Sequence, residues 1–220
     1  VVLNGLSRSM LLFIIASGLT LVFGLMGVVN FAHGAFYALG GYFAVVLLGF
    51  QDSFWIALFI APFLVAFLGI IVEFTTIRPL YDREPVYGLL LTFGLAIVIE
   101  EGITGIFGPD TRGIRIPELL SGVSRLLFGP YPRYRLFIIG VGIVLLVVLW
   151  AIFQKTRVGI IIRAGTYDSE MTDVLGINTR RVFTGVFGFG VALAAVAGII
   201  AGPMFSVSPT MGVDILIDAF

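Results

Sequence analysis

Long uncharged stretches dominate the pattern of hydrophobic and polar positions along this chain. Four of them, residues 10–29, 54–72, 136–153 and 182–205, each run for 18 to 24 residues without an Asp, Glu, Lys or Arg. A helix needs roughly 20 consecutive apolar residues to cross the hydrocarbon core of a bilayer. Repeated stretches of this length therefore predict a protein that crosses a membrane several times as helices.

The same pattern predicts six hydrophobic segments, and a seventh that begins near Asp214. A soluble protein with a buried apolar core is the alternative, but its apolar helices would need polar helices around them, and the sequence offers none. We therefore expect an all-α fold, a polytopic transmembrane helical bundle that forms a single domain over residues 1–220. The expected segments are residues 10–29, 34–50, 54–74, 86–106, 136–153 and 182–205.

The connections between these segments differ in character. Residues 75–85 form a short charged link, whereas residues 107–135 contain four prolines and four glycines, which argue against a long helix. Residues 154–181 are polar but contain no proline, so they can be helical. If every segment crosses, seven Lys or Arg residues lie on one side and six on the other, so the positive-inside bias does not orient the chain.

Composition narrows the possible functions. The chain is 59% hydrophobic and 12% charged, whereas a soluble domain carries about 25% charged residues. Its formal net charge of zero provides no basic surface for nucleic acid. One histidine and no cysteine argue against a metal site. With no phosphate-binding glycine loop and no hydrolytic grouping, we expect a chain that is not an enzyme and holds no cofactor.

We also expect both ends to be truncated, since the chain begins with valine and stops inside an apolar run.

The stretch GVVNFAHG, residues 27–34, carries the only histidine and interrupts a long uncharged region. The Asn30 amide and the His33 imidazole need hydrogen-bond partners, because an unsatisfied polar group is costly in hydrocarbon. The stretch is either a tight turn at the bilayer surface or a break at membrane depth that lines a solvated pathway. The residue types alone leave both explanations open.

Three acidic residues lie in or near the hydrophobic segments. Glu100 and Glu101 could form a proton or ion site inside the membrane, but only six residues follow them in their segment. We therefore expect them at the membrane interface. Glu73 borders the charged link and is expected at the interface as well.

The sixth segment carries small residues at every fourth position, namely Gly190, Ala194, Gly198 and Gly202. Small residues at this spacing allow helix backbones to approach each other closely in lipid. We expect this face to pack against other helices.

Residues 162–178, IRAGTYDSEMTDVLGIN, join two membrane segments and predict a short helix at about residues 168–175. Asp168 or Ser169 can begin it, and Glu170 and Asp173 would lie near the positive end of its dipole. Gly176 suits the position that ends a helix. On these residues alone, the segment could be any amphipathic loop helix.

Three blocks of the sequence resemble the permeases of branched-chain amino-acid ABC transporters, specifically the LivH-type subunit. They are GLTLVFGLMGVVNFAHGAFYALGGYFA, RPLYDREPVYGLLLTFGLAIVIEEGITGIFGPD and RAGTYDSEMTDVLGIN with the span that follows it. Together they cover about half of the chain. Thr172 and Asp173 depart from the more usual small residues, which affects the fit to a particular ATPase rather than the helix itself.

The resemblance implies an inner-membrane permease subunit with defined partners. These are a second permease subunit of the LivM type, two ABC ATPase subunits that bind the ATP, and a periplasmic solute-binding protein, with the lipid bilayer around the permease. Residues 154–181 would form a cytoplasmic coupling loop, which places residues 75–85 inside and 107–135 outside if residues 10–50 cross twice. The residues implied in ATPase coupling are Arg163, Asp168, Glu170, Met171, Leu175 and Gly176.

The resemblance also favours the pathway explanation for residues 27–34. Asn30, His33 and Gly34 would face a transient hydrated route, with contacts weak enough to permit release. Urea and short-amide importers share the same permease pattern, so the resemblance does not identify the transported solute. An ion-coupled secondary transporter is the second alternative, and it would depend on Glu100 or Glu101 rather than on an ATPase.

Overall fold

The computed structural model describes residues 2–27, 29–81, 83–126 and 129–219. Over these residues it contains six helices that are long and apolar enough to cross a membrane. Each overlaps one of the six predicted segments, although α1 begins eight residues before its predicted start, and this confirms the polytopic helical bundle. These helices are α1 (Val2–Met26), α2 (Ala32–Phe50), α3 (Phe54–Val72), α4 (Pro85–Phe107), α5 (Arg133–Lys155) and α8 (Thr179–Phe205).

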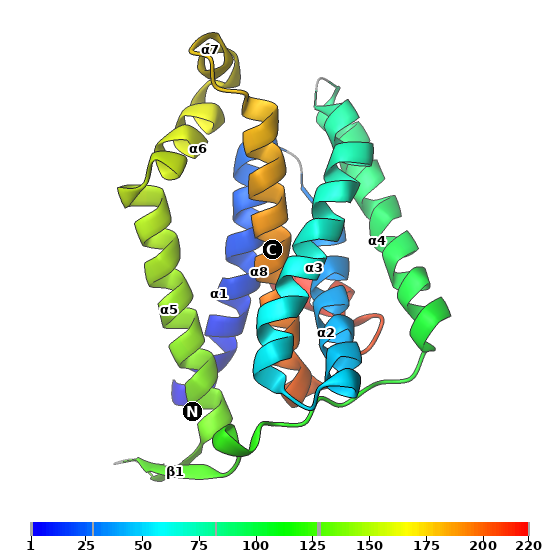
Figure 1. The fold of residues 1–220 in the computed structure, drawn as a ribbon, viewed down its shortest axis with the longest axis vertical. Helices are drawn as coiled ribbons and strands as arrows, with labels where there is room; N and C mark the ends of the chain where they lie inside the picture. Colours follow the sequence, from blue (N-terminus) through cyan, green and yellow to red (C-terminus); the bar gives the residue numbers. More distant parts are fainter. Residues whose placement is uncertain (1, 28, 82, 127–128, 220) are drawn as a thin grey trace.

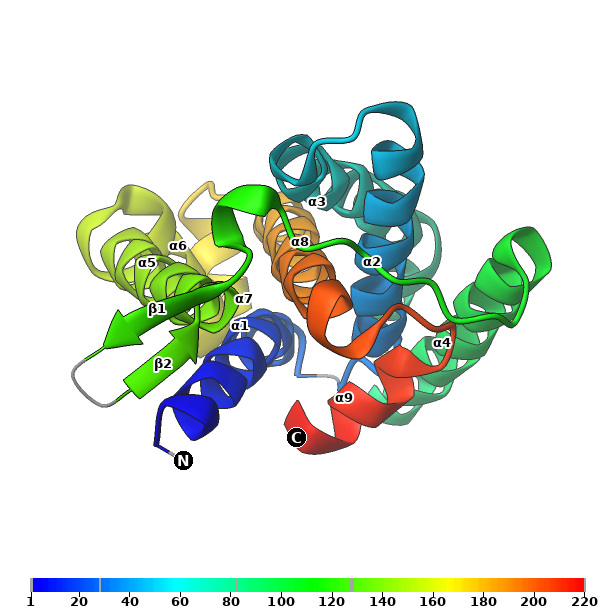
Figure 2. The same cartoon turned by 90° about the horizontal axis from the view of Figure 1, so that it is seen from below.

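Three shorter helices complete the bundle: α6 (Arg157–Tyr167), α7 (Ser169–Val174) and α9 (Met211–Ala219). The expected seventh segment corresponds to α9, which begins at Met211 rather than near Asp214. It lies across the bundle, beside α1 and α2 (Figure 2).

The proline-rich connection before α5 contains the two strands of the structure. A 3₁₀ turn, Glu118–Leu120, is followed there by an antiparallel hairpin of β1 (Val123–Leu126) and β2 (Gly129–Pro132). Proline lacks the backbone N–H that a helix interior uses, and glycine favours turns. The expectation that this connection contains no long helix is therefore confirmed, while the hairpin itself was not foreseen.

Helix α8 forms the centre of the bundle. It packs against α1, α2 and α3, whereas α4 and α5 lie at opposite edges of the molecule (Figures 1 and 2). Its small residues allow these close approaches. A side chain on Gly190 would lie 2.9 Å from the carbonyl oxygen of Gly18 in α1, and one on Gly198 would overlap the carbonyl oxygen of Tyr37 in α2.

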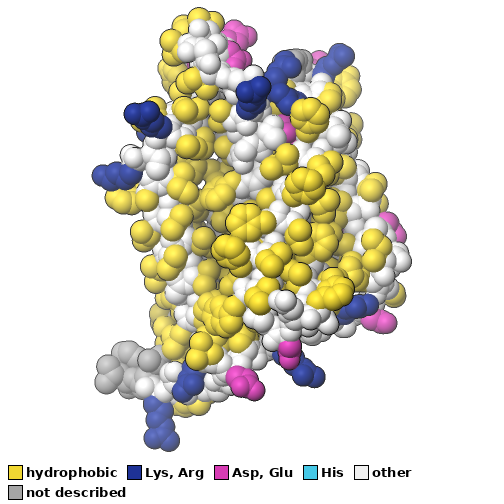
Figure 3. Space-filling model, viewed as in Figure 1, with side chains coloured by type: hydrophobic (Ala, Val, Ile, Leu, Met, Phe, Trp, Pro, Cys, Tyr) yellow, Lys and Arg dark blue, Asp and Glu magenta, His cyan; other side chains and the backbone are white. Residues whose placement is uncertain are grey.

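The outer helices expose large apolar side chains along their length. Phe59 of α3, Leu90 of α4 and Val144 of α5 are each more than half exposed. On the face drawn in Figure 3, apolar side chains cover the middle, and most charged side chains gather toward the two ends. Such a belt matches the hydrocarbon core of a bilayer, so the chain is a multi-pass membrane protein.

The connections fall at two opposite ends of the bundle. Helices α6 and α7 lie at the same end as the link between α3 and α4, and the hairpin lies at the other end (Figure 1). Residues 75–85, apart from Asp82 outside the described residues, therefore share an end with residues 154–181, as six crossings predict. Residues 10–50 contribute to two helices, α1 and α2, that are each long and apolar enough to cross a membrane.

Candidate functional site

The helical structure is interrupted between α1 and α2, at residues 27–31, which belong to the stretch GVVNFAHG described above. Gly27 adopts a φ of +64°, which ends α1, and Val28 lies outside the described residues. The side-chain oxygen of Asn30 accepts a hydrogen bond of 3.1 Å from the N–H of Ala32, where α2 begins. The hydroxyl of Thr92 in α4 donates to the carbonyl of Val29 at 3.1 Å. The break is thus held by its own amide and by α4.

His33 shows the depth at which this break lies. The side chain is fully buried, and its Nε2 lies 3.2 Å from the carbonyl oxygen of Ile15. The imidazole also lies against Gly18. Ile15 and Gly18 are in the middle of α1, so α2 begins inside the bundle rather than at its end. This geometry matches a break at membrane depth and not a turn at the surface; that it lines a route for solute stays a prediction.

Two polar atoms at the break lack partners within the described part of the chain. They are Nδ2 of Asn30 and Nδ1 of His33, and both side chains are buried. Such atoms retain unused capacity to bind a water molecule or a polar solute. Gly34, the third residue predicted for the route, is instead covered by α9, because a side chain there would overlap the carbonyl oxygen of Gly212.

A second candidate region lies at the end of the bundle that carries α6 and α7. Asp168 accepts a hydrogen bond of 2.8 Å from the N–H of Met171, and so it caps α7 as the sequence predicted. Gly176 has a φ of +85°, and its N–H donates to the carbonyl of Asp173 at 2.9 Å. The predicted short helix and its glycine stop are both present.

Asp173 has a different position from the one that the sequence suggested. It lies in the last turn of α7, not near the positive end of the dipole, because this helix ends at Val174. Its carboxylate accepts hydrogen bonds from the N–H of Thr179, at 2.9 Å, and from the Thr179 hydroxyl, at 3.0 Å. Thr179 is the first residue of α8 and is buried. The sequence analysis did not predict the contact between Asp173 and Thr179. An acidic residue shortly before the start of a helix could have indicated it.

The other end of the segment formed by α6 and α7 is hydrogen-bonded to α5. The guanidinium of Arg163 donates to the carbonyl oxygen of Phe153, near the end of α5. A side chain on Gly159 would overlap that same carbonyl, so the elbow between α5 and α6 is tight. Arg163 therefore links α6 to the end of α5.

The tip formed by α7 and its flanks exposes apolar side chains outside the membrane-spanning helices. Met171 and Leu175 were predicted from the sequence, and Tyr167 and Val174 were missed. All four are more than half exposed. Exposed apolar side chains that gather outside a membrane-spanning region are typical of a protein contact surface.

Glu73 borders the charged link, as the sequence indicates, and it is fully buried within the protein. It begins a π-helical turn, Glu73–Ile77, at the end of α3. The hydroxyl of Tyr81 donates to its Oε1, and the ring of Tyr81 packs edge-on against Phe183 of α8. Burial raises the pKa of Tyr81, and the hydrogen bond and charge of Glu73 raise it further, so Tyr81 remains the donor.

Glu100 and Glu101 contribute no comparable cluster. Glu101 is exposed and Glu100 is partly exposed, less than two turns before α4 ends at Phe107. Among the described residues, no group of His, Cys, Asp or Glu could hold a metal ion.

Comparison with known proteins agrees with this geometry. A family model described as the permease component of branched-chain amino acid transport systems matches residues 1–220. The permease protein BraD of Pseudomonas aeruginosa, named for high-affinity branched-chain amino acid transport, is 30% identical over 99% of this chain and 75% of its own.

Two further relatives carry the name LivH. The branched-chain amino acid permease protein LivH of Escherichia coli is 29% identical over 95% of this chain and 72% of its own. A probable LivH of Methanocaldococcus jannaschii is also 29% identical, over 96% of this chain and 69% of its own. No solved structure matches the chain. The family match over the whole chain, together with the identity to BraD over most of both chains, shows that this chain belongs to the permease component family of branched-chain amino acid transport systems.

Proposed function

We propose that this chain is a membrane-spanning permease subunit of an ABC importer that passes branched-chain or related amino acids across the inner membrane. The relatives named above support the solute class. The observation that carries the proposal is the exposed apolar tip of α7, which is joined by hydrogen bonds to a central span. In this arrangement two separate ABC ATPase subunits hydrolyse ATP, and the permease performs no chemistry.

The tip is suited to receive motion from an ATPase. Met171 and Leu175 offer apolar contact area, and Glu170 adds an exposed charge beside them. Displacement of α7 acts on α8 through Asp173 and Thr179. Because α8 packs against α1, α2 and α3, a shift of its end biases the whole bundle between two arrangements.

The solute route is proposed to pass the break between α1 and α2. Asn30 and His33 supply polar atoms without partners at that depth. Gly34 packs against Gly212 of α9, so the route opens when these two backbones separate. A periplasmic binding protein delivers the solute at the end with the hairpin, and a LivM-type subunit forms the other half of the path. The segment of α6 and α7 then faces the cytoplasm.

Two alternatives give different experimental results. A urea or short-amide importer would use the same coupling segment with another solute. An ion-coupled carrier would need no ATPase and would depend on a membrane-embedded carboxylate. Glu101 is exposed, which does not fit such a role.

The test uses the complete protein expressed with its partner subunits and purified through a tag on this chain. We expect ATPase subunits to co-purify, and a leucine-loaded binding protein to stimulate ATP hydrolysis in proteoliposomes. Exchange of Met171 and Leu175 for serine should reduce ATPase co-purification by at least tenfold. Val144→Ser, at an exposed apolar position of α5, is the matched control and should have no effect. Leucine uptake without any ATPase would contradict the proposal.

A further inference from the structure

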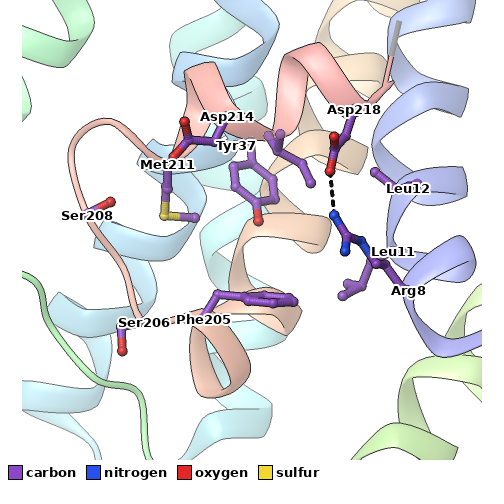
Figure 4. Close-up of a pocket in the computed structure, with 11 residues that line it drawn as sticks. Arg8, Leu11, Leu12, Tyr37, Phe205, Ser206, Ser208, Met211, Asp214 and Asp218 are labelled. Carbon is purple, nitrogen blue, oxygen red and sulfur yellow. Dashed lines mark hydrogen bonds and ion pairs between the residues drawn. The ribbon is translucent and has the colours of Figure 1, made fainter. Parts of the chain in front are cut away.

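A cavity of about 230 Å³ lies between the first half of α1, the end of α8 and α9 (Figure 4). Most ligand pockets for drug-sized molecules are larger, at roughly 300–1,000 Å³. This cavity is therefore suited to a small solute of about the size of one amino acid. It lies on the half of α1 farther from α6 and α7, toward the end of the bundle that carries the hairpin.

Charges of both signs border the cavity. The guanidinium of Arg8 in α1 lies 2.8 Å from Oδ2 of Asp218 in α9. Arginine has five N–H donors and a carboxylate has several acceptor positions, so this single contact leaves most of both groups available. Asp214 also lines the cavity, and no hydrogen bond or ion pair involves its side chain among the described residues.

The remaining walls are mainly apolar. Leu11 and Leu12 of α1, Phe205 of α8 and Ile215 of α9 line the cavity. In Figure 4 the Tyr37 hydroxyl points into the space above Phe205, across from the pair of Arg8 and Asp218. That hydroxyl has no hydrogen-bond partner within the described part of the chain.

We propose that this cavity is an outer binding site for an aliphatic amino acid in its zwitterionic form, a site that rests on the importer function proposed above. The carboxylate of the amino acid would bind the guanidinium of Arg8, and its ammonium would bind Asp218. Its aliphatic side chain would contact Leu12, Phe205 and Ile215. A zwitterion adds one charge of each sign and leaves the net charge of the cavity unchanged. Urea or a short amide has neither the charges nor the apolar part that these walls complement.

The position of the cavity connects it with the proposed route. Tyr37 follows His33 by about one turn of α2, so the cavity and the break share a helix. Helix α9 contributes to both, since Ile215 lines the cavity while Gly212 covers Gly34. Movement of α9 would therefore release a bound amino acid toward Asn30 and His33.

The test measures initial rates of leucine and valine uptake by the complete importer in proteoliposomes. Arg8→Gln removes the partner of the carboxylate and should lower uptake of both amino acids at least tenfold, mainly by raising KM. Leu12→Trp fills the apolar part and should lower leucine uptake several-fold more than uptake of the smaller valine. Arg135→Gln is the matched control, because Arg135 also donates to α1, at Asn4, but does not line the cavity. Its uptake should equal that of the wild type.

The outcomes separate this site from the function on which it rests. Leucine uptake by the wild type, with both cavity variants equal to the wild type, would overturn the site and leave the importer in place. Equal losses in Arg8→Gln and Arg135→Gln would also overturn it, because a general effect of charge would then explain the data. The side chains of Arg8 and Asp218 are 68% and 44% exposed, and exposed pairs contribute little to stability, so a purely structural role predicts normal uptake. A wild-type importer that transports urea and no amino acid would overturn both proposals.

Discussion

The carboxylate of Asp173, in the last turn of α7, accepts hydrogen bonds from both the backbone N–H and the hydroxyl of Thr179, the first residue of α8. The two residues join the exposed tip of the molecule to its central helix. Because Thr179 is buried, water cannot easily replace the carboxylate. The pair is a direct side-chain connection through which motion of α7 can reach α8.

Asp173→Ala should weaken this connection and uncouple ATP hydrolysis from transport. The buried hydroxyl of Thr179 would lose its acceptor, which costs about 1–3 kcal/mol. We expect the number of ATP molecules hydrolysed per solute transported to rise several-fold in proteoliposomes. Thr184→Val is the control, since that partly exposed threonine donates its hydroxyl only within α8. Unchanged stoichiometry in Asp173→Ala would show that another contact transmits the motion.

Gly176 should be sensitive to any side chain. Its φ of +85° lies in the left-handed region, where a Cβ costs about 1–2 kcal/mol. Gly176→Ala should lower coupling moderately. Gly176→Pro should abolish it while the protein still inserts, since proline fixes φ near −65° and lacks the N–H that Asp173 accepts.

Measurement of ATP-driven uptake, beside membrane levels of each variant, checks this prediction. Gly185→Ala in α8 is the matched control, because a side chain there meets no atom within 4 Å. Normal uptake by Gly176→Pro would exclude a coupling role for this turn.

The sequence predicted the spans well because the membrane imposes a length and a composition on each helix separately. The start of α2 inside the bundle could not be predicted in the same way. It depends on the imidazole of His33 meeting the carbonyl of Ile15, eighteen positions earlier. The burial of Glu73 likewise depends on Tyr81 folding back across the end of α3. Contacts between separate elements decide both features, and hydrophobic patterning carries no information about them.

In the candidate site, too, local interactions were predicted and contacts between separate helices were not. Asp168 and Gly176 were placed correctly because helix capping is a local interaction with a known residue preference. Asp173 was misplaced because its partner belongs to the next helix. The cavity beside Arg8 was not predicted, since its walls come from α1, α2, α8 and α9.

His33→Ala should reduce the initial rate of solute uptake several-fold without preventing assembly of the complex. The substitution removes the unpartnered Nδ1 and the contact with Ile15, whose loss costs about 0.5–1.5 kcal/mol. Uptake assays combined with gel filtration of the purified complex separate the two effects. Thr20→Ala, at an exposed polar position of α1, serves as the control. A variant that no longer assembles would assign His33 to packing alone.

Gly198→Ala should destabilise the bundle, because the new methyl group would overlap the carbonyl oxygen of Tyr37 in α2. Overpacking of this kind costs typically about 1–3 kcal/mol. We expect a lower midpoint of thermal unfolding in detergent. Gly140→Ala in α5, where a side chain meets no atom within 4 Å, should leave the midpoint unchanged or raise it slightly. Equal midpoints for the two variants would show that α8 and α2 separate without cost.

Tyr81→Phe tests whether the buried carboxylate of Glu73 helps to connect α3 with α8. The hydroxyl of Tyr81 is the described partner of this carboxylate, while its ring packs edge-on against Phe183. Phenylalanine keeps the ring contact and removes only the hydrogen bond, so the loss of stability should be about 1–3 kcal/mol. The double variant Glu73→Gln with Tyr81→Phe should recover part of that loss, because a neutral amide tolerates burial better than a carboxylate. Thermal unfolding of the three variants measures this recovery. If the double variant is less stable than Tyr81→Phe by the full effect of Glu73→Gln alone, then the two residues act independently.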